Sequence, residues 1–346
     1  MNILVIGNLH SQGSTNFYMA KALYEMGHRV KGISFGNLRY RPEDLSADYL
    51  LSLYGALPPL GPGYLRGVSV SGFTIESVTD AEVEPLRGAT PDLIIVCKFF
   101  EGSTKVVKDL AAVAHTHVWM PDPLSNGATS KVIEHAKVAT SSSCTGVGVV
   151  DYYRKAGVRN CFHIFEGVDP YYIHPFPPEP LLGCDVAFIG SVKNPRPAVA
   201  RAISKAGYSL RVYGDGWGTR NVYDWDFSMV CSSAKIVLGW NEQNDVIGYF
   251  SDRTFLTLAA GGLHLTHYVP GIENFFVWGE HLFWFNGISG MLAAIRNIME
   301  NYDKYVFMRE KGREYVLSKY TWKHSMQRLL DLVATCHKVG EEASDE

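Results

Sequence analysis

Alternating strand and helix patterns constrain the fold of this 346-residue chain more than any other feature. Residues 2–34 have the pattern of an apolar strand, a glycine-containing turn, an amphipathic helix and a second strand. The alternation continues to residue 165 and restarts at residue 184. Because repeated strand–helix–strand units build parallel sheets covered by helices, the sequence predicts an α/β fold with two doubly wound, Rossmann-like domains.

A proline-rich segment separates the two series. Residues 166–183 hold five prolines and show little periodicity, which is typical of a linker. The predicted parts are an N-terminal domain (1–166), a linker (167–183), a C-terminal domain (184–319), a closing helix (320–338) and a flexible tail (339–346). In the first series, strands are expected at 92–99, 117–120, 137–142 and 161–165. Open parallel sheets bind ligands at the carboxyl ends of their strands, so we expect a site in a cleft between the two sheets.

Composition excludes several classes of protein. A net charge of −3 does not favour a chain that mainly coats phosphate backbones. The six cysteines are scattered without a C-x-x-C pair, and the twelve histidines lack metal-ligand spacing, so no metal site and no disulfide framework are expected. Reduced thiols, the absence of a signal-peptide pattern and the absence of a long apolar run together predict a cytoplasmic protein.

Glycine-containing loops follow two predicted strands of the second domain. Gly190 and Ser191 end one strand, and Lys193 lies between them and a helix pattern that begins with prolines. Backbone N–H groups of such a loop, together with the lysine, can hold a diphosphate. The next strand leads into a tight turn where an aromatic side chain could stack on a base, formed by Tyr213, Gly214, Asp215 and Trp217. A simple structural turn is the alternative interpretation for each loop.

Arg253 raises a different question because it stands at the start of an apolar helix pattern. A helix N-terminus attracts anions and gives no stabilisation to a cation. The arginine is therefore either solvated or shares a bound anion with the helix N–H groups.

The first loop of the chain is not G-x-G-x-x-G, and no acidic residue ends the second strand, which disfavours a dehydrogenase.

The first domain offers a candidate catalytic carboxylate. A strand ends at Trp119, and Pro121 and Pro123 flank Asp122 at the expected carboxyl edge of the sheet. This position suits a general base for an acceptor hydroxyl, and the alternative is an aspartate in a proline-stiffened turn. His10, in the loop after the first strand, is the histidine best placed to face the cleft and is a second catalytic candidate.

Taken in order, several motifs resemble the GT-B glycosyltransferases, most closely the group 1 or spore-maturation-protein-like branch. They are W-x-x-D-P at 119–123, Y-x-x-x-G-x-x-N at 153–160, EGVDPYYIHP at 166–175, VAFIGS at 186–191, YGDGW at 213–217, SDRTFLTLAAGG at 251–262 and YTW at 320–322. The resemblance covers nearly the whole chain. It implies a nucleotide-sugar donor held by the second domain, an acceptor held by the first, a last helix that packs back on the first domain, and no essential metal.

This sequence departs from the resemblance at two positions. Many relatives carry glutamates where this chain has Gly248 and Leu256, and those glutamates hold the sugar and the ribose. The contacts must then come from elsewhere, and Asn241, Asn244 and Asp245 are candidates. A D-x-D at 224–226 resembles a metal–diphosphate motif of another glycosyltransferase class, but acidic capping of the following helix is the preferred interpretation.

The leading hypothesis is therefore a metal-independent hexosyl- or pentosyltransferase that uses a nucleotide-diphosphate sugar as co-substrate and needs no other cofactor. A nucleotide-sugar epimerase or hydrolase on the same fold is one alternative, and a non-catalytic nucleotide-sugar-binding protein is another. The acceptor stays open among a glycan, a protein, a lipid-linked precursor, a small molecule and a modified nucleic-acid base.

Overall fold

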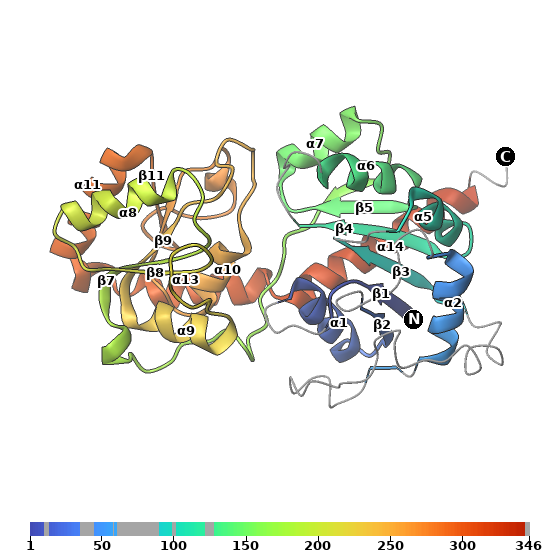
Figure 1. Cartoon of the computed structure of the whole chain (residues 1–346), viewed down its shortest axis with the longest axis horizontal. Coiled ribbons are helices and arrows are strands. Elements are labelled where there is room, and N and C mark those ends of the chain that lie inside the picture. The colour runs from blue at the N-terminus through green and yellow to red at the C-terminus, as the bar shows by residue number, and fades with distance from the viewer. Residues whose placement is uncertain are drawn as a thin grey trace. The chain divides into compact units, whose positions relative to one another are not determined.

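The computed structural model describes residues 1–9, 14–34, 45–57, 59–60, 90–98, 102–121 and 128–342 (Figure 1). The chain forms two compact units. The first comprises Met1–Phe165 together with Trp322–Glu346, and the second comprises Glu166–Thr321. No helix in the described ranges is long and apolar enough to cross a membrane.

The first unit is built on a six-stranded parallel sheet with the order β2-β1-β3-β4-β5-β6. The strands are β1 (Asn2–Ile6), β2 (Arg29–Ile33), β3 (Leu93–Cys97), β4 (His115–Met120), β5 (Ser141–Cys144) and β6 (Cys161–His163). The helices are α1 (Thr15–Glu25), α2 (Ala47–Ala56), α5 (Thr104–Ala111), α6 (Ala128–Val138), α7 (Val147–Lys155) and α14 (Trp322–Glu342).

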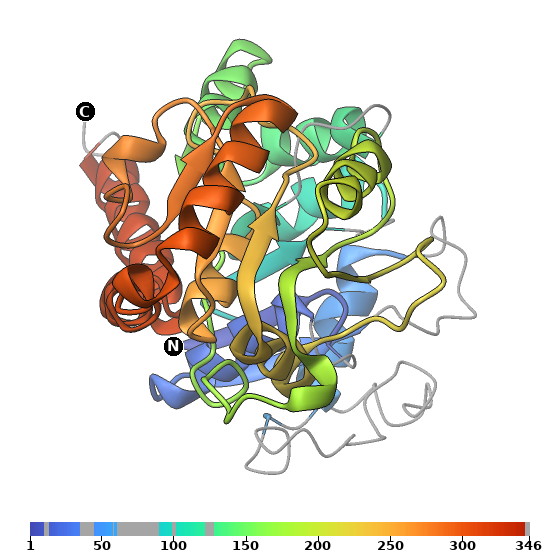
Figure 2. The ribbon, with the colours of Figure 1, turned by 90° about the vertical axis from the view of Figure 1, so that its left-hand side faces the viewer.

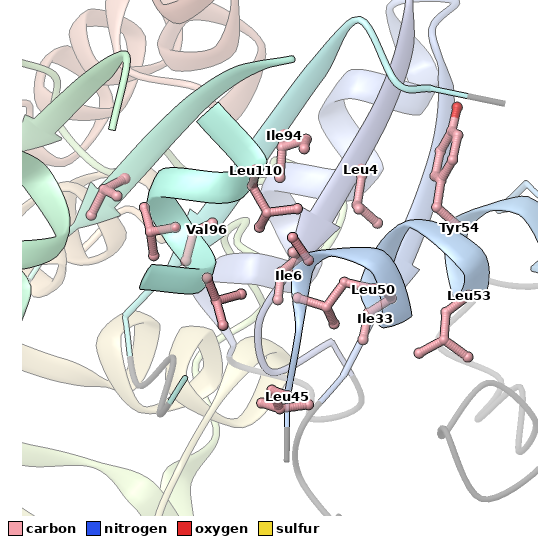
Figure 3. Close-up of a cluster of buried hydrophobic side chains, with 14 of the residues drawn as sticks. Leu4, Ile6, Ile33, Leu45, Leu50, Leu53, Tyr54, Ile94, Val96 and Leu110 are labelled. Carbon is pink, nitrogen blue, oxygen red and sulfur yellow. The ribbon is translucent and has the colours of Figure 1, made fainter. Parts of the chain in front are cut away.

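Both faces of this sheet are covered. Side chains alternate between the faces along each strand, and consecutive residues of β1 such as Ile3 and Leu4 are equally buried. On one face, Leu4 and Ile94 pack against Leu50 of α2 and Leu110 of α5 (Figure 3). Helix α1 packs along α14 instead.

One predicted strand of the first unit is wrong. The apolar residues of 137–142 suggested a strand, but α6 continues to Val138 and β5 begins at Ser141. Val138 contributes to the core from the end of the helix. The real strand holds three serines and a cysteine, Ser141–Cys144, and is fully buried without the apolar side chains that mark a strand in sequence.

The second unit has a five-stranded parallel sheet with the order β11-β10-β9-β7-β8. Its strands are β7 (Cys184–Ile189), β8 (Leu210–Tyr213), β9 (Ala234–Gly239), β10 (His264–His267) and β11 (Phe283–Phe285). Its helices are α8 (Arg196–Lys205), α9 (Asp224–Ser233), α10 (Asp252–Ala259), α11 (Gly287–Glu300), α12 (Tyr302–Tyr305) and α13 (Met308–Lys319), with short 3₁₀ turns η4 (Pro180–Leu182) and η5 (Ile272–Asn274).

Helices also cover both faces of the second sheet (Figure 2). Helices α8 and α11 contact each other and share one apolar core with the strands, whereas α10 packs against α9 and α13. These two covered parallel sheets confirm the predicted α/β class.

The proline-rich segment 166–183 belongs to the second unit and packs against the rest of that unit. Val168, Tyr172 and Ile173 are buried, and the amide of Val168 donates to the carbonyl oxygen of Tyr320 at 2.9 Å. The amide of Phe176 donates to Ser232 Oγ at 3.0 Å. The prolines lack an N–H to donate, and the residues between them supply both the apolar contacts and the hydrogen bonds.

Candidate functional site

The order of strands in the second sheet predicts a binding site at its carboxyl edge. From β7 the chain crosses by α8 to β8 on one side, and β9 then lies on the other side of β7. Such a reversal leaves a crevice outside the carboxyl ends of the two central strands. In this unit, β7 ends at Ile189 and β9 ends at Gly239, so the residues that follow them form the candidate site.

Hydrogen bonds join the loops after β7 and β8. The amide of Gly190 donates to Tyr213 O, and the amide of Val192 donates to Asp215 O, both at 2.8 Å. Gly214 approaches so closely that a Cβ there would lie 2.6 Å from the carbonyl carbon and oxygen of Gly190. The two predicted glycine loops therefore form one structure, which holds the backbone around Ser191 in place.

Trp217 packs against the joined loops and contacts Gly190 and Phe188. Its indole Nε1–H donates to Gly190 O at 2.8 Å, and its ring meets Phe188 edge-on at 6.2 Å. The carboxylate of Asp215 accepts from Asn221 Nδ2 at 2.7 Å. These contacts give both residues a structural role in the turn, and their predicted place beside a base stays a prediction.

Arg253 lies next to the glycine loop. A Cβ on Gly190 would be 3.5 Å from Arg253 Nη1. Asp252 Oδ1 accepts from the backbone amide of Arg253 at 2.8 Å, and no carboxylate or carbonyl oxygen in the described part of the chain pairs with the guanidinium group. The structure thus brings a cation without a counter-charge to the loop that was predicted to hold an anion.

A second arginine, Arg196, also lies next to Gly190 and was not predicted from the sequence. Arg196 is 4% exposed, and its Nε and Nη2 donate to Trp240 O at 3.2 and 2.8 Å while Nη1 donates to Ser191 O at 2.8 Å. Burial, and then the positive charge of Arg253, lower the pKa of Arg196 to about 10. Two neighbouring guanidinium groups that repel each other would both be stabilised by a bound anion.

The signal for Arg196 was present in the sequence but was attributed to the helix start. It stands between Pro195 and Pro197, and proline is typical of the first helical turn. A cation in that turn is as unexpected as Arg253 at the start of α10. The two together would have indicated a shared anion.

Lys193 and Asn244 are held by neighbours in the same loops. Lys193 Nζ forms an ion pair with Glu242 at 2.5 Å, and both side chains are exposed. An exposed ion pair of this kind is worth only about 0–1 kcal/mol, so the lysine can exchange partners readily. Asn244 Nδ2 donates to Asn241 O at 3.1 Å.

The two positions that lack the expected glutamates have different surroundings. Gly248 is buried with a φ of 61°, and its amide donates to Pro270 O at 2.9 Å. Leu256 is half-buried on α10. Neither can supply an acidic group.

Three remaining predictions concern carboxylates, a histidine and metals. His10 and Asp122 lie outside the described residues. Asp224 and Asp226 lie in the first turn of α9 after the N-cap residue Tyr223, and Asp226 pairs with Arg220 at 2.7 Å, so the interpretation of the D-x-D as an acidic cap is wrong. In the part of the chain that the structure covers, no group of three histidine, cysteine or carboxylate side chains could hold a metal ion.

A family model and several solved structures resemble this chain. The family model described as "Glycosyl transferase-like" matches residues 196–331. HepE from Anabaena, solved in complex with UDP-glucose, is 11% identical with a TM-score of 0.66, over 97% of this chain and 100% of HepE. Sucrose-phosphate synthase from Thermosynechococcus elongatus is 12% identical with a TM-score of 0.63, over 98% and 100% of the two chains.

The catalytic domain of starch synthase IV from Arabidopsis thaliana, bound to ADP and acarbose, is 10% identical with a TM-score of 0.62, over 97% and 99% of the two chains. A search of curated proteins finds no match. The chain has the GT-B fold, and the glycosyltransferase-like family model matches residues 196–331. The resemblance to the GT-B glycosyltransferases is confirmed at the level of the fold, and its assignment to one branch stays a prediction.

Proposed function

We propose that this protein is a glycosyltransferase that moves a sugar from a nucleotide-diphosphate sugar to a hydroxyl acceptor. The carrying observation is the pair of guanidinium groups at the glycine loop after β7, of which Arg253 has no counter-charge in the described residues. A diphosphate is an anion of the right chemistry for this place. The likeness in fold to HepE, which binds UDP-glucose, supports the choice of donor class.

The chemistry that this arrangement would perform is a substitution at the anomeric carbon. The bond from that carbon to the diphosphate oxygen breaks, a bond to the acceptor oxygen forms, and the acceptor proton passes to a base. Negative charge gathers on the leaving diphosphate, where Arg253, the N–H groups at the start of α10 and a released Lys193 would stabilise it. Because these groups are cationic or partly positive, we propose that the reaction needs no metal.

A binding experiment tests this proposal. Calorimetric titration with UDP-, GDP-, ADP- and dTDP-glucose should show binding of at least one donor by the wild-type protein. Arg253→Ala should weaken it about 10- to 100-fold, because a charge-assisted hydrogen bond is worth roughly 1.5–3 kcal/mol. Arg220→Ala, which removes an exposed arginine paired with Asp226, is the matched control and should bind normally. Failure of every donor to bind would contradict the proposal.

The acceptor side needs its own test. We propose that Asp122 orients or deprotonates the acceptor hydroxyl and that His10 assists. Asp122→Asn should lower turnover by about two or more orders of magnitude while leaving donor binding unchanged. Unchanged turnover in Asp122→Asn would remove that role without affecting the donor proposal, and His10→Gln tests the histidine in the same way.

The missing glutamates favour a second candidate function. With Gly248 and Leu256 in place of two acidic residues, the protein could bind a nucleotide sugar without transferring it, or act on the donor alone as an epimerase or hydrolase. Incubation of a bound donor without acceptor distinguishes these outcomes. A transferase leaves the donor intact, an epimerase or hydrolase converts it, and a binding protein shows no turnover with any acceptor.

A further inference from the structure

A small cavity of mixed polar and apolar lining lies beside Arg253, between the sheet of the second unit and α10. Its polar lining includes Asn241, Arg253, Thr254, Thr257 and His264, and the residues from Val237 to Trp240, with Ile189 and Phe227, supply the rest. It has room for about one water-sized group. Arg253 belongs both to this cavity and to the surroundings of Gly190, so whatever fills the cavity adjoins the proposed diphosphate site.

His264 offers the cavity a hydrogen-bond acceptor. Its Nδ1 lies 3.1 Å from the carbonyl oxygen of Val237, which can only accept, so Nδ1 carries the proton and donates. The side chain is 1% exposed, and burial lowers its pKa to about 4, which keeps the ring neutral at physiological pH. The other nitrogen, Nε2, is therefore an unprotonated acceptor, and it is buried without a hydrogen-bond partner in the structure as described.

Asn241 offers a donor. It is 4% exposed, and its Oδ1 accepts from the amide of Ser251 at 3.4 Å, which fixes the orientation of the side-chain amide. Its Nδ2 is then a donor, and it too is buried without a partner within the described ranges. Both side chains line the same cavity.

Gly239 leaves space for this arrangement. A Cβ at this residue would lie 2.7 Å from Cε1 and 3.0 Å from Nε2 of His264, and 2.6 Å from Oγ1 of Thr266. The imidazole edge thus rests directly against the backbone of β9. A larger residue at 239 would displace the ring from the cavity.

The unpaired atoms select the chemistry of the occupant. Thr257 Oγ1 also lines the cavity and is unpaired in the described ranges, and as a hydroxyl it can donate or accept. A group that satisfies the other two atoms must donate to His264 Nε2 and accept from Asn241 Nδ2. A phosphate or carboxylate oxygen would face the lone pair of Nε2, and an ammonium group could not accept from Nδ2. A hydroxyl group does both, as does the water that would occupy the cavity in the free protein.

We propose that this cavity is a subsite for one hydroxyl group of the donor, read by His264 and Asn241. The inference rests on the proposed function, because the hydroxyl must belong to a molecule whose diphosphate lies at Arg253. In this proposal, two uncharged side chains, His264 and Asn241, recognise the hydroxyl group. The 2′-hydroxyl of the ribose and a hydroxyl of the transferred sugar are the two candidate sources.

The test is a titration of His264→Asn. Asparagine can keep a donor near the position of Nδ1 and so retain the bond to Val237 O, but it has no atom at the position of Nε2. Wild type and variant are titrated with UDP, 2′-deoxy-UDP and UDP-glucose, with the corresponding ADP and GDP compounds in parallel. His264→Asn should lose about three- to tenfold in affinity for compounds that carry the recognised hydroxyl, and nothing for the analogue that lacks it.

The ligands separate the two sources. A loss for UDP that vanishes with 2′-deoxy-UDP assigns the ribose, whereas a loss confined to UDP-glucose assigns the sugar. Asn241→Ala is the second variant, since it removes the donor without adding a charge beside Arg253; it serves if His264→Asn does not fold. His281→Asn is the control, because His281 stacks on Tyr315 at 3.9 Å and does not line the cavity.

Two failures are distinguishable. Equal affinities of wild type and both cavity variants for every compound, or an equal loss for all three compounds of a series, would overturn the hydroxyl subsite and leave the proposed function standing. If the wild-type protein binds no nucleotide at all, the proposed function and the subsite are both overturned.

Discussion

The loops of the candidate site can join only because residue 214 is a glycine and has no Cβ. Its φ of 132° is rare for a residue with a Cβ, and that Cβ would collide with the backbone of Gly190 at 2.6 Å. Backbone atoms on both sides cannot rotate away as a side chain would. The junction between the two loops therefore requires glycine at this position.

We expect Gly214→Ala to lower the free energy of unfolding by at least about 2 kcal/mol, because it combines backbone strain with a steric clash. Urea unfolding measures this loss. Gly218→Ala is the matched control: Gly218 also has a positive φ, 73°, but nothing lies within 4 Å of its Cβ position. The control should lose about 1 kcal/mol. Equal losses in the two variants would contradict the steric argument.

At the scale of elements, β4 and β5 share an unusual set of buried hydrogen bonds. Ser141 Oγ lies 2.8 Å from both His115 Nε2 and His117 Nδ1, and Ser143 Oγ lies 2.8 Å from His117 Nε2. His117 is fully buried, and desolvation, followed by the charge of His115, lowers its pKa to about 3. The folded state therefore holds His117 neutral.

This burial predicts a loss of stability in acid. The unfolded chain protonates His117 near pH 6.5, whereas the folded chain does so only near pH 3, so its contribution is lost as the pH falls between these values. At pH 5 the loss is about 2 kcal/mol. Urea unfolding of wild type and His117→Gln at pH 7 and pH 5 measures it. The variant should be less stable at pH 7 but lose less between the two pH values; parallel losses would refute the assignment.

The same elements show what sequence reasoning can and cannot find. Alternation of strand and helix suffices to predict two parallel sheets, and the rule for carboxyl edges brings Gly190, Gly214 and Arg253 together. Strand β5 was misplaced because its buried residues are serines that bond to histidines across the sheet. Arg196 was missed because its place between two prolines was attributed to the helix start, and His264 because its partner, Val237 O, is 27 residues away in sequence.

At the scale of the whole molecule, α14 completes the first unit from the far end of the chain. Trp322, Met326, Leu329 and Val333 are buried at spacings of one helical face. Trp322 lies 6.0 Å from the ring of Trp119, and Lys323 pairs with Glu25 of α1 at 3.0 Å. Helix α14 thus contributes side chains to the same hydrophobic core as the strands of the first sheet.

Because the two units have separate cores, damage to α14 should affect only the first. Trp322→Ala should lower the stability of that unit by about 3–5 kcal/mol. Hydrogen exchange measured by mass spectrometry should show faster exchange in peptides of β3 and β4 and unchanged exchange in β7 and β9. Trp278→Ala, at a tryptophan that is 53% exposed in the second unit, is the control and should leave the first unit unchanged. Equal acceleration in both units would show that the cores are coupled.

Because α14 belongs to the first unit but follows the second in sequence, the first unit can be completed only after the second has been synthesised. All of residues 166–321 leave the ribosome between the last strand of the first unit and the helix that covers α1. At about 5–20 residues per second this takes on the order of 10–30 s. The second unit is contiguous and can reach its native state within that time, while the first still exposes the apolar surface that Trp322 and Met326 will cover. The nascent first unit therefore exposes part of its apolar core surface for longer than the second unit does.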